Sequence, residues 1–217
     1  MKKKAVIFDF DGTLCESFPL IGFGINGAYE RIANKNIDEE ELFKCFGPTE
    51  EGIFKKLFHN DERLYKKAFI EYLRIYKENH NKFIHFDKEM DEIIKFIKDN
   101  NAYCFVLTGR SLDSLNISLE ELKIKDRFDD FYFGSIEGVN KPTSFKNVFK
   151  EYGLTSEDVL YIGDSSEDVR NCKEVGVKII STLIYSKYEE EKILELNKEN
   201  TVYDFSELKS KIGEFIF

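Results

Sequence analysis

The sequence lacks the features that would place the protein outside the cell or in a membrane. It has only four cysteines, which are widely spaced and form no Cys-x-x-Cys pair, so neither a zinc site nor a disulfide framework is indicated. Reduced thiols in a cytoplasmic protein are the expected state. No window approaches the roughly 20 apolar residues of a membrane-spanning helix, and the apolar stretch after Lys2–Lys4 is too short for a secretory signal. We therefore expect a cytoplasmic protein with no membrane partner.

Basic charge is also scarce. The 217 residues include 32 lysines and arginines against 41 aspartates and glutamates, which gives a net charge of −9. Nucleic-acid-binding proteins usually present a basic face, and none is evident here, so we expect a small-molecule partner and no DNA or RNA. Tryptophan is absent, yet 42% of the residues are hydrophobic. That fraction suffices for one large domain, or for a core with a smaller insertion.

Predicted strands and helices alternate through the last two thirds of the chain. Apolar runs predict strands at Tyr103–Leu107, Phe131–Phe133, Val159–Ile162 and Val177–Ile180, and helical periodicity covers residues 87–98, 112–122, 143–152, 166–175 and 205–217. This alternation is typical of βαβ units and a parallel sheet. The apolar run Ala5–Phe8 predicts one more buried strand, which must join the same sheet because a lone strand is not stable.

Residues 18–79 are expected to be entirely helical. Helical spacing begins at Phe18, a short helix covers about 38–46, another starts at Thr49, and the longest spans Asp61–Asn79. We therefore predict an α/β fold: a Rossmann-like core with a parallel sheet, formed by residues 1–16 and 83–217, and a small inserted α-helical cap, residues 17–82. The cap should fold over the carboxyl edge of the sheet, with hinges near 15–18 and 80–86.

Two aspartates directly follow the first predicted strand. Asp9 and Asp11 are spaced i, i+2, so that their side chains point to the same side of an extended chain. Open α/β sheets bind ligands at the carboxyl ends of their strands, which is where this pair lies. Two carboxylates held so close need a cation or a shared proton. Hard oxygen ligands favour Mg²⁺, so the pair predicts metal-assisted chemistry.

Other polar groups follow later strands or precede helices. They are Thr108-Gly109, Lys141-Pro142, and Gly163-Asp164 with Asp168 behind it. All carboxyl ends of a parallel sheet lie on one edge, so these groups can converge with the first pair. Carboxylates with a divalent cation make a hard-metal site, while a hydroxyl, backbone N–H groups and a lysine make an anion site. Together they suit a phosphoryl group, whose transfer depends on positioning and charge stabilisation.

In this order and spacing the four groups resemble the motifs of the haloacid dehalogenase-like hydrolase superfamily, the first appearing as Asp9-Phe10-Asp11-Gly12-Thr13. The helical insertion resembles the subclass with an α-helical cap, which includes phosphoglycolate phosphatase-like members. The segment 46–51 is also similar to a cap loop of phosphoglycolate phosphatase-like and nucleotidase-like proteins.

The resemblance implies a role for each motif residue. Asp9 would be the nucleophile that attacks phosphorus, and Asp11 would protonate the leaving alcohol and then activate water. Thr108 and the Gly109 N–H would bind phosphoryl oxygens, and Lys141 would orient Asp9 and offset negative charge.

The same resemblance implies a Mg²⁺ site. The metal would be held by Asp9, by the main-chain carbonyl of Asp11 and by Asp164. Asp168 would act through a metal-bound water or from behind the metal ligands, and Gly12 would also lie behind them.

Each of these residues also has a simpler explanation. Asp9 and Asp11 could form a turn or helix cap, Thr108 could cap the helix after it, and Lys141 could be a solvated surface lysine. Asp168 could simply favour the dipole at a helix N-terminus.

The motifs together favour a Mg²⁺-dependent phosphatase that hydrolyses a small phosphorylated metabolite through an aspartyl-phosphate and is phosphoglycolate phosphatase-like. A sugar phosphomutase, a 5′-nucleotidase or a pyrophosphatase would share the motifs. The non-enzyme alternative is a phospho-receiver-like regulatory module, although receivers carry the phosphorylated aspartate before the threonine and lysine in a shorter domain. The oligomeric state is left open by the sequence.

Overall fold

The computed structural model describes residues 3–45 and 49–217, and within this part all six strands run parallel in one sheet. The strands are β1 (Ala5–Phe8), β2 (Tyr103–Leu107), β3 (Asp130–Tyr132), β4 (Val159–Gly163), β5 (Lys178–Thr182) and β6 (Thr201–Val202). The helices are α1 (Phe18–Ala33), α2 (Glu39–Cys45), α3 (Glu50–Leu57), α4 (Glu62–Phe83), α5 (Lys88–Asp99), α6 (Leu112–Glu121), α7 (Lys141–Tyr152), α8 (Ser166–Val175), α9 (Glu190–Asn197) and α10 (Phe205–Ile216).

The strand order β3-β2-β1-β4-β5-β6 places β1 at the centre of the sheet. The chain winds outward from β1 through β2 to β3 and then returns to β4 on the other side of β1. The winding direction therefore reverses between β1 and β4, where Phe8 pairs with both Val106 and Ile162. Open α/β sheets bind their ligands at such a switch point, outside the carboxyl ends of the strands.

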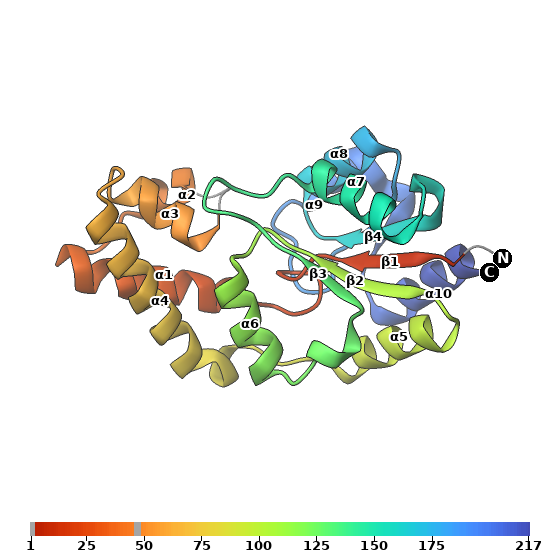
Figure 1. The fold of residues 1–217 in the computed structure, drawn as a ribbon, viewed down its shortest axis with the longest axis horizontal. Coiled ribbons are helices and arrows are strands. Elements are labelled where there is room, and N and C mark those ends of the chain that lie inside the picture. Colours follow the sequence, from red (N-terminus) through yellow and green to blue (C-terminus); the bar gives the residue numbers. More distant parts are fainter. Residues whose placement is uncertain (1–2, 46–48) are drawn as a thin grey trace.

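Alternate residues of β1 pack on opposite faces of the sheet, as a pleated strand requires. Val6 and Phe8 join one apolar cluster, which α5 and α10 cover, while Ala5 and Ile7 join a second cluster under α7 and α8. Figure 1 shows this layering, with α7 and α8 above the sheet and α5 and α10 below it. All four residues of β1 are buried, which explains why the strand reads as a continuous apolar run.

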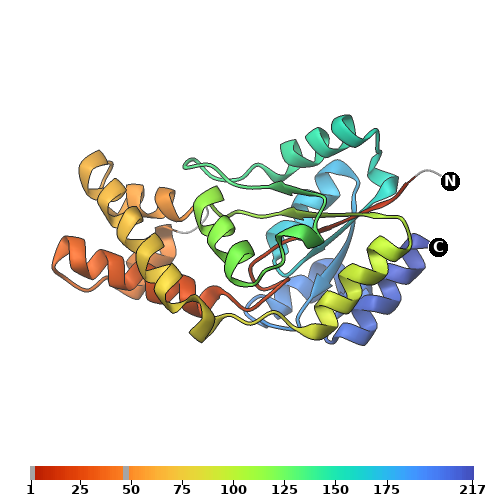
Figure 2. The same ribbon diagram turned by 60° about the horizontal axis from the view of Figure 1, so that its bottom comes forward.

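Helices α1 to α4 lie beyond the carboxyl ends of the strands, at the opposite end of the molecule from both termini (Figure 1). Helices α1 and α4 run alongside each other, as Figure 2 also shows. Their apolar faces meet around Ile25, Tyr72 and Tyr76, all fully buried. The α/β fold and its Rossmann-like parallel sheet are thus confirmed, and the division into a core and a cap at residues 17–82 stays our prediction.

Several element boundaries differ from expectation. Helix α7 begins at Lys141 rather than 143, because Pro142 is compatible with a first helical turn and Asn140 caps it by accepting from the Thr143 N–H. Helix α4 continues to Phe83, four residues past its predicted end.

Helix α9 and strand β6 were not predicted at all. Helix α9 buries only Ile193 and β6 has two residues, so neither has a periodic pattern to detect. Within the resemblance at 46–51, residues 46–48 lie outside the described residues, while Thr49 caps α3. None of the described helices is long and apolar enough to cross a membrane.

Candidate active site

Asp9 lies at the switch point of the sheet. Its backbone N–H donates to the Ile162 carbonyl of β4 at 2.9 Å, which continues the β1–β4 ladder by one residue. Its Oδ1 accepts from the Phe10 N–H at 2.6 Å, so the carboxylate is fixed by the backbone that follows the strand. The side chain is 13% exposed. Asp9 is therefore a rigid, nearly buried carboxylate with one oxygen left for another partner.

Lys141 supplies that partner from the first turn of α7. Its Nζ lies 2.6 Å from Asp9 Oδ2 and 2.6 Å from Asp168 Oδ1, and it donates to the Tyr161 hydroxyl at 2.8 Å. The three donors of the ammonium group are thus all used. Burial alone would lower the pKa of Lys141, but the carboxylates of Asp168 and Asp9 raise it above its usual range. Lys141 is a fixed positive charge and not a solvated surface lysine.

Tyr161 was missed by the sequence reasoning. It lies in β4 and is fully buried, and its hydroxyl donates to the Leu107 carbonyl at 3.1 Å while it accepts from Lys141. In the sequence it is simply one residue of an apolar strand. Only the pairing of β4 beside β1 brings its hydroxyl to the site.

Three carboxylates converge beside this lysine. Oxygens of Asp9, Asp164 and Asp168 all lie within 4.8 Å of one another. Burial raises the pKa of Asp9 to about 6, although Lys141 opposes the shift. Burial, and then the Asp9 carboxylate, raise the pKa of Asp164 well above its usual range. Three acidic groups face one positive charge, so the cluster needs further positive charge or bound protons.

The donor set fits a hard divalent cation such as Mg²⁺, which prefers carboxylate oxygens. Asp168 is already occupied: Oδ1 accepts from Lys141, and Oδ2 accepts from the Ser165 hydroxyl at 2.7 Å in a capping box that opens α8. Asp9 accepts one hydrogen bond at each oxygen and Asp164 accepts one from Thr13 at 3.4 Å, so both keep lone pairs for a metal. Asp168 therefore acts both as a helix cap and as the second partner of Lys141, behind the other two carboxylates.

A hollow of about 200 Å³ opens over this cluster. Its lining combines the carboxylates and Lys141 with two apolar side chains and the start of α8, and consists of Asp9, Asp11, Phe18, Gly109, Val139, Lys141, Asp164, Ser165, Glu167, Asp168 and Asn171. Of the predicted site residues it contains all except Gly12 and Thr108. Thr108 is fully buried, and its hydroxyl accepts from the Arg110 N–H at 3.3 Å.

Gly12 packs directly against Asp164. Its φ of +71° is a left-handed conformation, and a Cβ added there would lie far inside van der Waals contact with the Asp164 carboxylate and 2.9 Å from Phe18 Cε2. The hydroxyl of Thr13 donates to Asp164 Oδ1 at 3.4 Å from the same turn. The turn after Asp11 thus sets the position of Asp164 from across the sheet edge.

We expect Gly12→Ala to displace Asp164 and lower activity at least roughly 10-fold, with a loss of stability of about 1–3 kcal/mol from strain and overpacking. Phosphate release and urea unfolding would measure the two effects. Gly22→Ala is the matched control, because Gly22 lies in α1 with open space around its Cβ position. Equal activity of the two variants would contradict the role of Gly12.

Asp11 lines the same hollow and contacts the residue that precedes α1. Its Oδ1 accepts a hydrogen bond from the Ser17 hydroxyl and lies 3.4 Å from Arg110 Nε. Burial raises the pKa of the Asp11 carboxyl, and Arg110 opposes that shift. Ser17 precedes α1, yet its hydroxyl serves Asp11 and makes no capping hydrogen bond. A carboxyl with a raised pKa at the wall of this hollow suits proton donation to a bound group.

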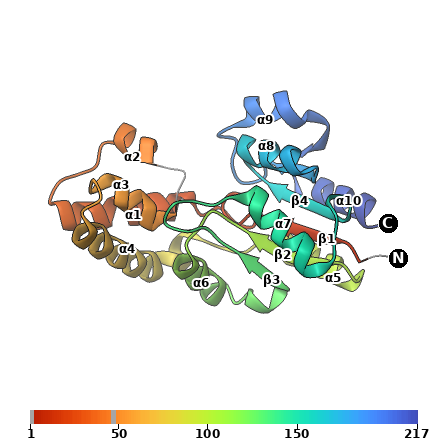
Figure 3. The same cartoon turned by 45° about the horizontal axis from the view of Figure 1, so that its top comes forward.

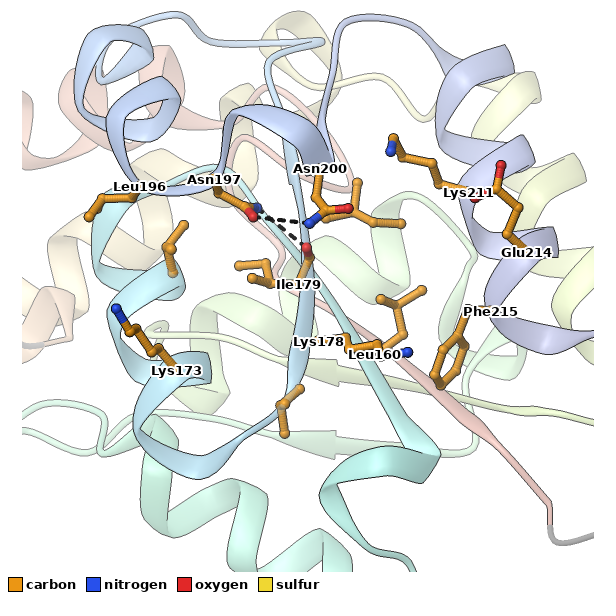
Figure 4. A pocket seen from close by; sticks show the side chains of 13 residues that line it. Leu160, Lys173, Lys178, Ile179, Leu196, Asn197, Asn200, Lys211, Glu214 and Phe215 are labelled. Carbon is orange, nitrogen blue, oxygen red and sulfur yellow. Dashed lines mark hydrogen bonds between the residues drawn. The ribbon is translucent and has the colours of Figure 1, made fainter.

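A larger hollow, of about 570 Å³, lies elsewhere on the sheet (Figure 4). It is bordered by α8, α9 and α10 over β4 and β5, and its floor is apolar. None of the predicted site residues lines it. This hollow is the larger of the two, but the carboxylates, Lys141 and the switch point of the sheet all lie at the smaller one.

Comparison with known proteins decides the family. The family described as haloacid dehalogenase-like hydrolase matches residues 6–182, which include every residue of the cluster. The chain belongs to this family. The predicted resemblance and the prediction of an enzyme are thereby confirmed. Among curated proteins, this haloacid dehalogenase-like hydrolase is similar to enolase-phosphatase E1 of Aquifex aeolicus (strain VF5), with 25% identity over 95 residues. That match covers 42% of this chain and 43% of the relative, so less than half of either.

Solved structures share the whole fold of this hydrolase. One from Haemophilus somnus 129pt, described as a predicted phosphoglycolate phosphatase, has a TM-score of 0.80 and 20% identity, covering 98% of this chain and 99% of that one. CbbY from Rhodobacter sphaeroides in complex with phosphate has a TM-score of 0.78 and 18% identity, covering 95% and 96%. A predicted phosphatase from Clostridium acetobutylicum has a TM-score of 0.77 and 22% identity, covering 99% of this chain and 100% of that one.

Proposed function

We propose that the protein is a Mg²⁺-dependent phosphatase that hydrolyses a small phosphomonoester through an aspartyl-phosphate on Asp9, in the manner of a phosphoglycolate phosphatase. The observation that carries the proposal is the Asp9 carboxylate, held 2.6 Å from Lys141 in the wall of a hollow that also contains Asp11 and Asp164. A buried carboxylate with a fixed cation on one side and an acid two residues away suits in-line attack on phosphorus.

The metal would be held by Asp9, by Asp164 and by the main-chain carbonyl of Asp11. When bound, Mg²⁺ would supply positive charge that offsets the carboxylates and the phosphoryl oxygens. The Gly109 N–H would hold a phosphoryl oxygen on the protein side of the hollow, and Lys141 and Thr108 would join it if each exchanged a present partner.

In the first step an oxygen of Asp9 attacks phosphorus and the bond from phosphorus to the leaving oxygen breaks. The Asp11 carboxyl gives its proton to that oxygen, so an alcohol leaves, Asp9 carries the phosphoryl group and Asp11 is a carboxylate. The raised pKa of Asp11 supports a protonated carboxyl at the start of this step.

In the second step Asp11 accepts a proton from water as the water oxygen attacks phosphorus. The bond between Asp9 and phosphorus breaks, which releases inorganic phosphate and restores the Asp9 carboxylate and the protonated Asp11. One residue thus serves as acid and then as base, and no other proton donor is needed.

Two observations support a small substrate. The hollow of about 200 Å³ is below the 300–1,000 Å³ range of ordinary ligand pockets. Helices α1 to α4 lie over the same edge of the sheet and would cover the leaving group.

We also infer a cytoplasmic location, because all four cysteines are free and buried.

The deciding experiment is a panel of phosphomonoesters with Mg²⁺, with a chelator and without metal, scored by release of inorganic phosphate. We expect turnover of small esters, with phosphoglycolate among the better ones, and loss of turnover with the chelator. Absence of turnover with every ester would overturn the proposal. Glucose 1-phosphate with a bisphosphate activator tests for a mutase, which would give an isomerised sugar phosphate in place of free phosphate.

Mg²⁺ should also stabilise the folded protein. The pKa of Asp9 is about 6 in the folded state against an ordinary value of 3.8. Between these values the metal-free fold binds more protons than the unfolded chain, so the contribution of Asp9 to stability falls as pH rises. Mg²⁺ needs deprotonated ligands. We therefore expect Mg²⁺ to raise the melting temperature more at pH 7 than at pH 5. At pH 7 the rise should be about 5–10 °C at a Mg²⁺ concentration of roughly 100 times Kd. An equal shift in Asp164→Asn would place the metal elsewhere.

A further inference from the structure

Arg110 is a fully buried charge that none of the four motifs includes. It follows Gly109 after β2, and its side chain is 1% exposed. The guanidinium carbon lies 5.0 Å from the centre of the Phe10 ring and 4.9 Å from that of Tyr76. Taking such a charge out of water is costly unless it is paired and hydrogen-bonded. Its partners therefore indicate what the charge is for.

The partners of Arg110 come both from the part that contains the sheet and from the helices α1 to α4. Nη1 donates to the Ser118 hydroxyl of α6 at 2.8 Å, and Nη2 donates to the Tyr76 hydroxyl of α4. The third side of the guanidinium, Nε, has no hydrogen-bond partner among the described residues. It faces two carboxylates, Asp11 Oδ1 at 3.4 Å and Glu50 Oε1 at 3.7 Å. The two outer nitrogens thus fix the group so that Nε lies beside both carboxylates, an ion-pair contact without a hydrogen bond.

Glu50 belongs to the first turn of α3 and is itself buried. Its Oε1 accepts from the Ser114 hydroxyl at 2.5 Å, and its Oε2 accepts from the Ser111 N–H at 3.0 Å. Ser111 is the N-cap of α6, so a carboxylate from α3 rests on the positive end of that helix. Glu50 therefore docks α3 against α6 and places a second carboxylate beside Nε of Arg110.

We propose that Arg110 is a positioning residue for Asp11, held in place by Glu50. Asp11 Oδ1 faces the Ser17 hydroxyl and Arg110 Nε, which leaves Oδ2 as the oxygen that exchanges protons with the leaving group and water. Because Glu50 and Tyr76 belong to α3 and α4, Arg110 keeps this position only while those helices are docked. This inference deepens the proposed phosphatase function and rests on it.

A second ion pair also joins α3 to the part of the molecule that contains the sheet, and it offers a control. Lys55 of α3 lies 2.6 Å from Glu137, in the segment between β3 and α7 that extends toward α3 in Figure 3. The side chains of Lys55 and Glu137 are 30% and 74% exposed, so the pair is solvated and contributes little. Breaking it tests whether any contact between the two parts matters, or only the buried one.

The test uses leaving groups of different acidity. p-Nitrophenolate leaves without much help from an acid, whereas an alkoxide needs a well-placed proton. Glu50→Gln keeps the shape and one of the two acceptor oxygens but removes the charge beside Arg110 Nε. Arg110→Lys keeps the charge but not the fork that bonds to two helices. For both variants we expect the single-turnover rate of alcohol release from an alkyl phosphate to fall about 10- to 100-fold. The KM and the burst rate of p-nitrophenolate release should change less than about 3-fold, because hydrolysis of the aspartyl-phosphate, which also uses Asp11, follows that burst.

Glu137→Gln should leave the rates on both substrates unchanged. An equal fall on both substrates in Glu50→Gln and Arg110→Lys would show a merely structural role, and no fall on either would show that Asp11 needs no such support. Either result overturns the inference while the wild-type protein still hydrolyses both esters. If the proposed phosphatase function is itself wrong, the wild-type protein will hydrolyse neither ester, which distinguishes the two failures.

Discussion

Asp9→Asn is expected to lower phosphate release by at least about four orders of magnitude, as removal of a nucleophile does in other enzymes that work through a covalent intermediate. The amide has no anionic oxygen to attack phosphorus, and it also weakens the metal site. The fold should survive, because Lys141 keeps Asp168 as its partner at 2.6 Å and the Tyr161 hydroxyl at 2.8 Å. Steady-state assays with the best ester of the panel would measure the loss.

The matched control for this variant is Asp91→Asn, at a partly exposed aspartate of α5 whose Oδ1 lies 2.7 Å from Arg127 Nε. It removes the same charge from the same kind of side chain, and we expect unchanged turnover. Far-ultraviolet circular dichroism would verify that both variants are folded. Activity of Asp9→Asn within about 10-fold of wild type would exclude Asp9 as the nucleophile.

Lys141→Met should have the largest effect on stability. The side chain keeps its length but no longer separates the carboxylates of Asp9 and Asp168, which would then face each other without a cation. Removing one partner of a buried ion pair costs about 3–5 kcal/mol. We expect that loss in the free energy of unfolding, measured with urea in metal-free buffer at pH 7, together with loss of turnover.

Added Mg²⁺ should recover part of this loss, because a cation held by Asp9 and Asp164 would replace some of the missing charge. The control is Lys146→Met, an exposed lysine on the same helix, which should change stability by less than about 0.5 kcal/mol. If the two lysine variants lose the same stability, the charge at Lys141 does not balance the buried carboxylates.

The sequence predicted the positions of the acidic residues well, for a physical reason. Strand β1 is buried on both faces, so it appears as an unbroken apolar run, and residues after such a strand in a parallel sheet must lie at the ligand-binding edge. The same reasoning located Asp164 after β4. It needed no knowledge of strand order, since every parallel strand ends on that edge.

Residues that depend on tertiary pairing escaped prediction. Glu50 and Arg110 are 60 positions apart, and Tyr161 lies within an apolar run, so no local pattern distinguishes them. Arg110 also looks like any charged residue near a strand end, and only its burial between Phe10 and Tyr76 reveals it. Helix α9 escaped because one buried residue makes no period.

Trapping the covalent intermediate tests the central claim most directly. Asp11→Asn should still transfer the phosphoryl group from p-nitrophenyl phosphate, whose leaving group needs little protonation, but should lack the base for hydrolysis. We predict a burst of p-nitrophenolate and, after acid quench and peptide mass analysis, one added phosphoryl group on Asp9. Turnover with no adduct, or an adduct on any other residue, would contradict the account.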